Sequence, residues 1–230
     1  MKTIGVLGGM GPEASSVFYQ MIIDISHEKY KAVQDTDYPP MIIFSLALKG
    51  FDERGIVNEK QVLSQLIEAS KRLERSGSDF IVITCNTVHH FIEDLRKNVK
   101  IPILSIIEEV AKEINKDKIK TVGLLASESA IELDVYGRIL KKNGINFIIP
   151  NNKEQKIVTQ AILNVMTGKD LEKDKKELIE IINKMGLNGA KGVILGCTEL
   201  PLIISEKSNK MKAYDTLKIL AERSLILARQ

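Results

Sequence analysis

The sequence has few cysteines, no tryptophan and almost no net charge. Only Cys85 and Cys197 occur in 230 residues, which excludes a disulfide-rich secreted scaffold. The formal net charge of +3 gives no indication of nucleic-acid binding through bulk positive charge. Hydrophobic residues make up 44% and charged residues 27%, as in a folded globular protein rather than a disordered chain.

Long hydrophobic runs are also missing. No apolar stretch approaches the roughly 18 residues that span a bilayer. The apolar start of the chain is too short for a signal peptide before glycines interrupt it. We therefore expect a cytoplasmic protein with no membrane or nucleic-acid partner, in which both cysteines are reduced thiols. Its length predicts one large or two small domains.

Short β-branched segments alternate with longer amphipathic segments along the whole chain. This order is typical of βαβ units and predicts an α/β fold with parallel sheets. The expected strands cover residues 3–7, 41–46, 80–83, 101–104, 120–125, 145–149, 192–195 and 211–214. Helices with one apolar face are expected between them. The highly charged residues 169–177 predict an exposed helix start or loop.

Two segments of the first half recur in the second half. TIGVL from Thr3 matches TVGLL from Thr121, 118 positions later, and the strand before Cys85 matches the strand before Cys197, 112 positions later. Because order and spacing agree, the pattern favours a duplication over the chance similarity of apolar strands. It predicts two similar Rossmann-like domains related by pseudo-two-fold symmetry, the first formed by residues 1–100 with 208–230 and the second by residues 101–207.

The two cysteines end equivalent predicted strands, where open α/β sheets bind ligands. Asn86, Thr87 and Thr198 follow them and are expected to cap helices, whose N-termini favour a thiolate. A buried cysteine is often a plain core residue, but the equivalent positions favour a function. Facing each other across a cleft between the domains, one thiolate would remove an α-proton and the other thiol would return a proton to the opposite face. This reaction requires no metal and no cofactor.

The glycine-rich residues 8–13 are expected to bind a small anion. Their backbone amides would converge on a carboxylate ahead of a helix that begins near Pro12. The spacing does not match a dinucleotide fingerprint, so NAD is not expected. At the equivalent place in the second half, Ser127 and Ser129 supply hydroxyl groups, although Ser127 is also typical of a helix N-cap.

His89 and His90 follow Cys85 closely enough to suggest a metal site. Zinc needs three or four converging ligands, and two adjacent histidines on a helix point in different directions. We therefore expect no metal, with His89 on a helix near the cleft and His90 partly at the surface.

Five segments together resemble aspartate racemases of the cofactor-independent aspartate/glutamate racemase superfamily. They are IGVLGGMGPEAS from Ile4, CNTVH from Cys85, IPILSIIEE from Ile101, GLLAS from Gly123 and GCTELP around Cys197. The resemblance covers essentially the full chain, and the two cysteine motifs are its specific part. It implies two α/β domains with the active site in the cleft between them, proton transfer by two cysteines without pyridoxal phosphate, and a homodimer.

The resemblance also implies roles for individual residues. Cys85 and Cys197 would be the acid/base pair, with Cys85 serving the D-enantiomer. The implied substrate contacts are Met10, Gly11, Asn86, Thr87, Ser127 and Thr198. Basic residues hold the side-chain carboxylate in such enzymes, and the candidates are Arg54, its rival Lys49, and Lys169. Residues 45–55 depart in length from the archaeal pattern and Ala130 replaces a common threonine, and both departures concern the choice of substrate.

The leading hypothesis is interconversion of L- and D-aspartate. Alternatives on the same fold are racemisation of glutamate, of a broader set of amino acids, or of a hydantoin. An alternative of another class is a catalytically silent amino-acid-binding protein. The two thiols argue against the silent protein, because binding alone does not require two opposed thiols.

Overall fold

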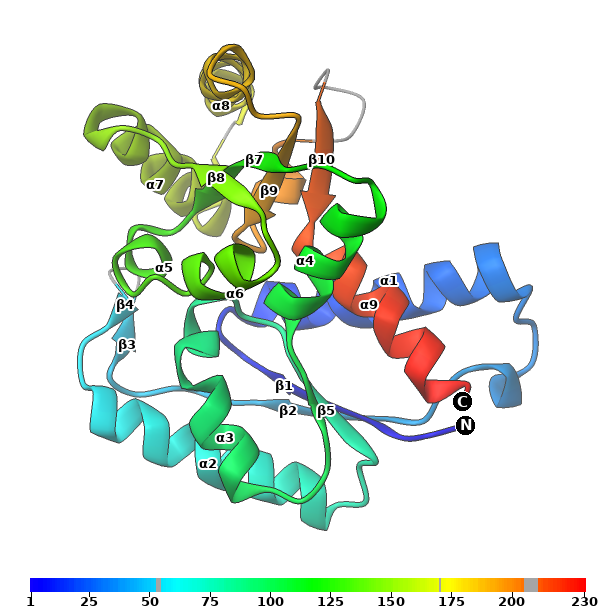
Figure 1. Ribbon diagram of the computed structural model, residues 1–230. Coiled ribbons are helices and arrows are strands. Elements are labelled where there is room, and N and C mark those ends of the chain that lie inside the picture. The colour runs from blue at the N-terminus through cyan, green and yellow to red at the C-terminus, as the bar shows by residue number, and fades with distance from the viewer. Residues whose placement is uncertain (53–54, 170, 205–210) are drawn as a thin grey trace. The chain divides into compact units, whose positions relative to one another are not determined.

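The computed structural model describes residues 1–52, 55–169, 171–204 and 211–230 (Figure 1). They form two compact units, residues 1–109 with 217–230 and residues 110–216. Each unit contains one four-stranded parallel sheet, so the predicted α/β fold with parallel sheets is confirmed. The predicted domain boundary after residue 207 lies outside the described residues.

The first unit is built on a sheet of strand order β2-β1-β5-β6. Its strands are β1 (Ile4–Gly8), β2 (Met41–Ser45), β5 (Phe80–Ile83) and β6 (Ile103–Leu104). The two short strands β3 (Phe51–Asp52) and β4 (Gly55–Ile56) form a separate antiparallel sheet. The helices are α1 (Pro12–Tyr30), η1 (Asp35–Asp37), α2 (Glu59–Arg75), η2 (Thr87–Phe91), α3 (Ile92–Asn98) and α9 (Thr216–Ala228).

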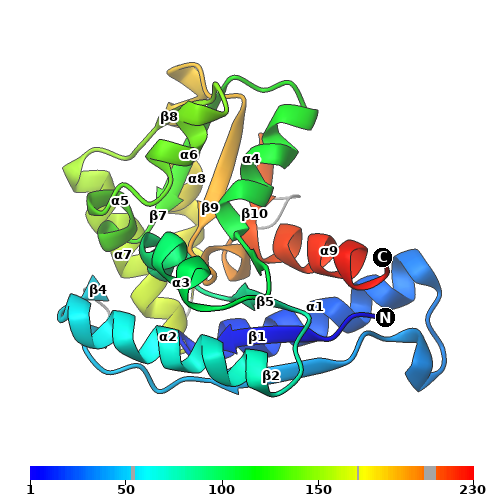
Figure 2. The same cartoon turned by 60° about the horizontal axis from the view of Figure 1, so that its bottom comes forward.

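The C-terminal helix α9 lies beside α1 in this unit (Figures 1 and 2). Lys29 of α1 forms an ion pair of 2.9 Å with Glu222 of α9. The amide of Lys2 donates to the carbonyl of Ala228 at 2.8 Å, so the two ends of the chain meet. Arg223 of α9 also pairs at 2.7 Å with Glu109, whose side chain is almost completely buried. These contacts attach the end of the chain to its beginning.

The second unit is built on a sheet of strand order β10-β9-β7-β8. Its strands are β7 (Thr121–Ala126), β8 (Asn146–Ile148), β9 (Gly192–Gly196) and β10 (Lys212–Asp215). Its helices are α5 (Glu128–Glu132), α6 (Gly137–Lys142), α7 (Asn152–Met166), α8 (Glu172–Leu187) and η3 (Leu200–Leu202). Helix α4 (Ile106–Lys116) contains the boundary between the two units.

The duplication seen in the sequence recurs in the strand order and in the register. Read from its other edge, the second sheet is β8-β7-β9-β10, which matches β2-β1-β5-β6 strand for strand. Gly5 lies opposite Ile81 in the first sheet, and Gly123 lies opposite Val193 in the second. Gly5 and Gly123 are 118 positions apart, and Ile81 and Val193 are 112 positions apart, as in the repeated segments of the sequence. The two units are therefore copies of one βαβ design.

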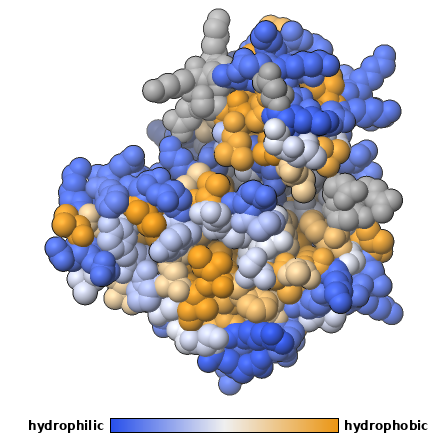
Figure 3. Space-filling model, turned by 180° about the vertical axis from the view of Figure 1, so that it is seen from behind, coloured by the Kyte–Doolittle hydropathy of each residue, from blue (hydrophilic) through white to orange (hydrophobic). Residues whose placement is uncertain are grey.

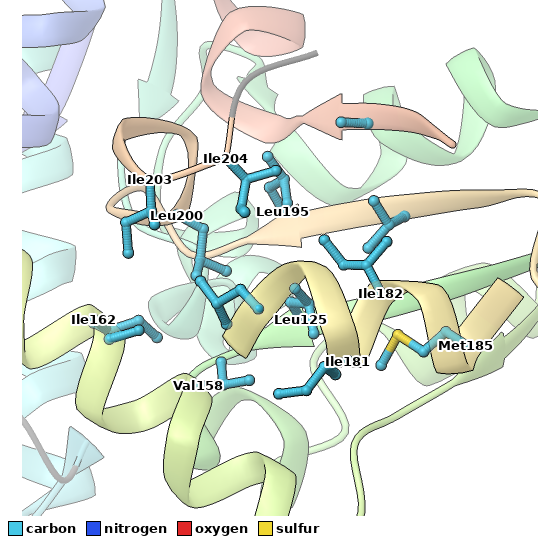
Figure 4. Packing of buried hydrophobic residues seen from close by; sticks show 14 of the residues in the cluster. Leu125, Val158, Ile162, Ile181, Ile182, Met185, Leu195, Leu200, Ile203 and Ile204 are labelled. Atoms are coloured by element: carbon cyan, nitrogen blue, oxygen red, sulfur yellow. The ribbon is translucent and has the colours of Figure 1, made fainter. Parts of the chain in front are cut away.

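Each sheet packs on an apolar core. In the second unit, α7 and α8 cover one face of the sheet and bury Val158, Ile181 and Ile182 against Leu125 and Leu195 (Figure 4). In the first unit α2 packs on β1 and β5 in the same way. Each such side chain contributes about 1.5–3 kcal/mol on burial. The predicted apolar stripes are therefore core, as expected.

The eight predicted strands all form, with small differences at their ends. The largest difference is at β6, which begins at Ile103 rather than at residue 101, because Pro102 has no N–H for the ladder. The expectation of an exposed segment over residues 169–177 is wrong at Asp174. Its side chain is buried, and both carboxylate oxygens accept from the Asn164 amide at 3.0 Å.

The surface carries hydrophilic side chains and apolar patches of limited size on the face drawn in Figure 3. Exposed apolar residues include Leu187 at the end of α8 and Val33 after α1. Among the described residues, no helix is both long enough and apolar enough to cross a membrane.

Candidate active site

The glycine loop and the Cys85 strand end lie at the carboxyl edge of the first sheet. Leu7 is opposite Ile83, and the Thr84 amide donates to the Leu7 carbonyl at 3.1 Å. The Ser15 hydroxyl lies 3.1 Å from the Thr84 hydroxyl and accepts from the Gly9 amide at 3.0 Å. A Cβ at Gly8 would collide with the Ser15 hydroxyl. Glycine at this position thus lets Ser15 join the loop to the segment that carries Cys85.

The structure of the glycine loop limits which of its groups could bind an anion. As expected, Pro12 occupies the first turn of α1 behind Gly11. The Gly9 amide is already bonded to Ser15, so it does not contribute to anion binding. The Met10 side chain is buried in the same apolar cluster as Cys85. The prediction for Met10 and Gly11 therefore concerns their backbone amides rather than the Met10 side chain.

Cys85 lies in a buried turn after β5, and 6% of its surface is exposed. Asn86 and Thr87 beside it are buried as well. The prediction that these residues cap a helix is wrong in its details, because Asn86 has helical backbone angles and its side chain makes no capping bond. The helix that follows is the five-residue 3-10 helix η2 rather than an α-helix. The Cys85 thiol is therefore followed by a short 3-10 helix and not by the N-terminus of an α-helix.

His89 of η2 connects Cys85 to helix α4. Its Nδ1 lies 2.8 Å from the Cys85 carbonyl oxygen, and its Nε2 accepts from the Ile106 amide at 3.2 Å. Because a carbonyl only accepts and an amide only donates, the ring is neutral with its proton on Nδ1. Both nitrogens are thereby used, so His89 is no metal ligand here. His90 is partly exposed and lies 3.1 Å from Glu59.

The second sheet has matching groups at its own carboxyl edge. Ala126 is opposite Gly196, so Ser127 and Cys197 leave neighbouring strand ends. Ser127 caps α5, as predicted, by accepting from the Ala130 amide at 3.3 Å. Gln155 of α7 donates to the Ala126 carbonyl at 3.0 Å and so covers this strand end.

Cys197 is partly exposed and contacts a carboxylate. Its Sγ lies 2.9 Å from Oε2 of Glu199, which also accepts from the Thr198 hydroxyl at 3.1 Å. The prediction that Thr198 caps a helix is wrong, because Glu199 occupies that position and the following 3-10 helix η3 has only three residues. The turn after β9 instead directs Glu199 back to the thiol.

A comparison with protein families identifies a match that covers most of the chain. The model of the Asp/Glu/hydantoin racemase family matches residues 7–223. The chain belongs to this racemase family. The racemase resemblance expected from the cysteine motifs is confirmed.

Relatives and solved structures match nearly the whole racemase chain. The broad specificity amino-acid racemase RacX of Bacillus subtilis is 30% identical over 222 residues, which are 96% of each chain. An aspartate racemase homologue from Pyrococcus horikoshii OT3 has a TM-score of 0.87 and 33% identity, with 100% of both chains covered. The aspartate racemase of Picrophilus torridus has a TM-score of 0.84 and 27% identity, with 100% of this chain and 95% of that chain covered.

Three basic residues are predicted to hold a substrate carboxylate. Arg54 lies outside the described residues. Lys49 is exposed, and its backbone bonds to Gln65 at 3.1 Å and 2.8 Å. Lys169 is exposed beyond the end of α7. The buried face of α7 itself presents Gln155, Val158, Ala161 and Ile162.

Two residues of the racemase contact the cysteines in ways that the sequence prediction did not include: Glu199 was not singled out, and His89 was expected near the cleft with no contact to Cys85 assigned. Glu199 stands two residues after Cys197, and a carboxylate so placed in a turn reaches back to the thiol. His89 stands four residues after Cys85, which places its ring beside the Cys85 carbonyl in a helical turn. In both cases the signal was a polar side chain at short, turn-compatible spacing after a strand-end cysteine.

The neutral, buried His89 predicts that acid destabilises the racemase. Burial lowers the pKa of His89 from 6.5 to about 4. The unfolded chain therefore binds a proton near pH 6.5 that the folded chain does not bind. The stabilisation is complete above this pH and falls by about 3 kcal/mol as the pH decreases toward 4. Between about pH 7.5 and about pH 5, urea unfolding is expected to show about 2 kcal/mol of this loss.

Carboxylates also titrate in acid, so the histidine contribution requires matched variants. His89→Asn is expected to reduce the loss of unfolding free energy between the two pH values. His90→Asn serves as the control, because His90 is partly exposed and is expected to leave the loss unchanged. Equal losses in wild type and His89→Asn would show that His89 does not resist protonation.

Proposed function

We propose that the protein racemises α-amino acids, with aspartate as its first candidate substrate, through proton transfer by Cys85 and Cys197. The observation that carries this proposal is the equivalent position of the two thiols. Each follows the same strand of a duplicated unit, β5 in one and β9 in the other. The proposed reaction requires that the two thiols act on opposite faces of the substrate carbon.

The chemistry balances without an external reactant. One thiolate takes the α-proton, so the C–H bond breaks and an S–H bond forms. The opposite thiol then gives its proton to the other face of the carbanion, and the two cysteines end with exchanged protonation states. Converging amides and hydroxyls stabilise the charge that develops on the α-carboxylate. The groups proposed for this are Met10, Gly11, Asn86, Thr87, Ser127 and Thr198.

Glu199 gives the two thiols unequal environments in this proposal. An ionised carboxylate 2.9 Å from Sγ disfavours a second negative charge there and accepts the S–H hydrogen bond. Cys197 is therefore the thiol of the resting enzyme, and Cys85 is its thiolate base. Together with the assignment of Cys85 to the D-enantiomer, this makes the resting enzyme ready for D-aspartate.

Solvent exchange tests the reaction directly. Purified protein without added cofactor is incubated with L-aspartate in deuterium oxide. At early times the two enantiomers are separated, and mass spectrometry measures the deuterium content of each. Two bases predict a deuterated product and a remaining substrate that keeps its protium, because the proton removed and the proton delivered sit on different sulfurs. Binding of amino acids without any exchange would contradict the proposal and favour a silent binding protein.

Broad specificity is the second candidate. It is supported by the similarity to the broad specificity amino-acid racemase of Bacillus subtilis, which covers 96% of each chain. Initial rates are compared for aspartate, glutamate, alanine, leucine and lysine. A preference for aspartate of about 100-fold, near 3 kcal/mol, supports the first candidate. Rates within about tenfold of one another support the second.

A further inference from the structure

We infer that His89 is a positioning residue for Cys85. Its ring holds the Cys85 carbonyl against the start of α4 and thereby fixes the direction in which the thiol is presented. The inference rests on the proposed function, since it assigns a catalytic consequence to the position of Cys85.

The sheet itself no longer holds the backbone at Cys85. The pairing of β5 with β6 ends at Val82 and Leu104, and the pairing with β1 ends at Ile83. Cys85 lies two residues beyond that last pair and is buried, where a carbonyl without a donor would be unfavourable. Nδ1–H of His89 donates to the Cys85 carbonyl at 2.8 Å. The His89 ring therefore holds the backbone at Cys85, beyond the last residue of β5.

The other side of the ring is anchored just as specifically. Ile106 is the first residue of α4, and the first amides of a helix have no partner within it. Nε2 of His89 accepts this amide at 3.2 Å. One buried ring thus bonds to two backbone groups, the Cys85 carbonyl and the Ile106 amide, and it joins the segment after β5 to the start of α4.

Charged neighbours hold the elements on either side of the ring. Arg96 of α3 donates to Glu108 of α4 through two bonds of 2.9 Å and 2.8 Å, and to the Ile103 carbonyl at 3.1 Å. Arg96 also pairs with the exposed Glu93. Arg96 disfavours and Glu108 favours a protonated ring, with burial as the larger influence. A protonated ring would lose the bond from Ile106. The pair of bonds from His89 to Cys85 and Ile106, called the clamp below, therefore requires the neutral tautomer.

The catalytic consequence follows from the geometry of proton transfer. A misplacement of about 1 Å at a reacting group costs up to about 100-fold in rate. Loss of the bond to the Cys85 carbonyl is therefore expected to lower kcat by at least about tenfold, with KM changed by less than about twofold. A purely structural role would lower the melting temperature and leave kcat of the folded enzyme unchanged.

Two substitutions separate the two sides of the ring. His89→Asn places an amide N–H at the position of Nδ1, so it keeps the bond to Cys85 and loses the bond to Ile106. His89→Gln extends beyond that position and is expected to lose the bond to Cys85. Val62→Ala, at a fully buried position of α2 in the same apolar cluster, is the control for lost packing alone.

The expected result is a kcat within about threefold of wild type for His89→Asn and Val62→Ala, and a decrease of at least about tenfold for His89→Gln. All kinetics are measured well below each melting temperature. Equal kcat values for the Asn and Gln variants would overturn the inference.

Nitrogen-15 NMR of the histidine rings tests the clamp without any substrate. At neutral pH, His89 is expected as the neutral tautomer with its proton on Nδ1. A proton on Nε2, or a charged ring, would overturn the inference even if the enzyme racemises. A clamp seen by NMR in a protein without solvent-exchange activity would instead contradict the proposed function alone.

Discussion

Replacing either cysteine with serine is expected to lower kcat/KM for racemisation by about 1000-fold or more. A thiol with an ordinary pKa of about 8.5 provides some thiolate near neutral pH, whereas a serine hydroxyl provides essentially no alkoxide. The losses must be equal for L- and D-aspartate, because the equilibrium constant between two enantiomers in water is one. Polarimetry or circular dichroism of both reactions measures them.

Solvent exchange then assigns the two bases. In Cys197→Ser, Cys85 still removes and returns a proton on its own face, so one enantiomer exchanges its α-hydrogen without inversion. The resemblance predicts that this enantiomer is D-aspartate, and that Cys85→Ser shows the converse with L-aspartate. Racemisation within about tenfold of wild type in either variant would contradict the two-base mechanism. Thermal melting confirms that each variant is folded.

Sequence periodicity predicted the fold well because the signal is local. Buried parallel strands appear as short β-branched runs, and their spacing in the two halves recurs in the register of Gly5 and Gly123 with their partners. The cysteines were identifiable for the same reason, since each ends such a run. The free energy that forms these elements comes largely from burying the residues that form the pattern.

The surroundings of the thiols were less predictable because they depend on turn geometry and on distant partners. Asn86 and Thr198 have side chains typical of helix caps, but the same side chains also favour turns, and short 3-10 helices follow both cysteines. The contact of His89 with Ile106 joins residues of two different elements. The buried Asp174 has its partner Asn164 on another helix. Periodicity contains no information on such pairs.

Glu199→Gln is expected to lower kcat/KM by about tenfold at about pH 9.5, equally for both enantiomers, because a thiol with an ordinary pKa of about 8.5 is about nine-tenths ionised there. The amide has the size of the carboxylate but no charge, and it still contacts Sγ. The active enzyme has one thiol and one thiolate, and the carboxylate beside Cys197 opposes loss of the last thiol proton. Without it, the inactive form with two thiolates appears at lower pH. The alkaline limb of the pH profile of kcat/KM should therefore move to lower pH.

The position of that limb distinguishes an electrostatic role from simple packing. Glu199→Asp keeps the charge but withdraws it by one methylene, so its limb is expected between those of wild type and Glu199→Gln. Glu132→Gln, which removes an exposed carboxylate at the end of α5, should change neither the rate nor the limb. A Glu199→Gln enzyme with lower activity and an unmoved limb would mean that Glu199 shapes the turn after β9 without controlling the proton on Cys197. A shifted limb would instead make the resting enzyme asymmetric, with Cys85 as the base and Cys197 as the acid.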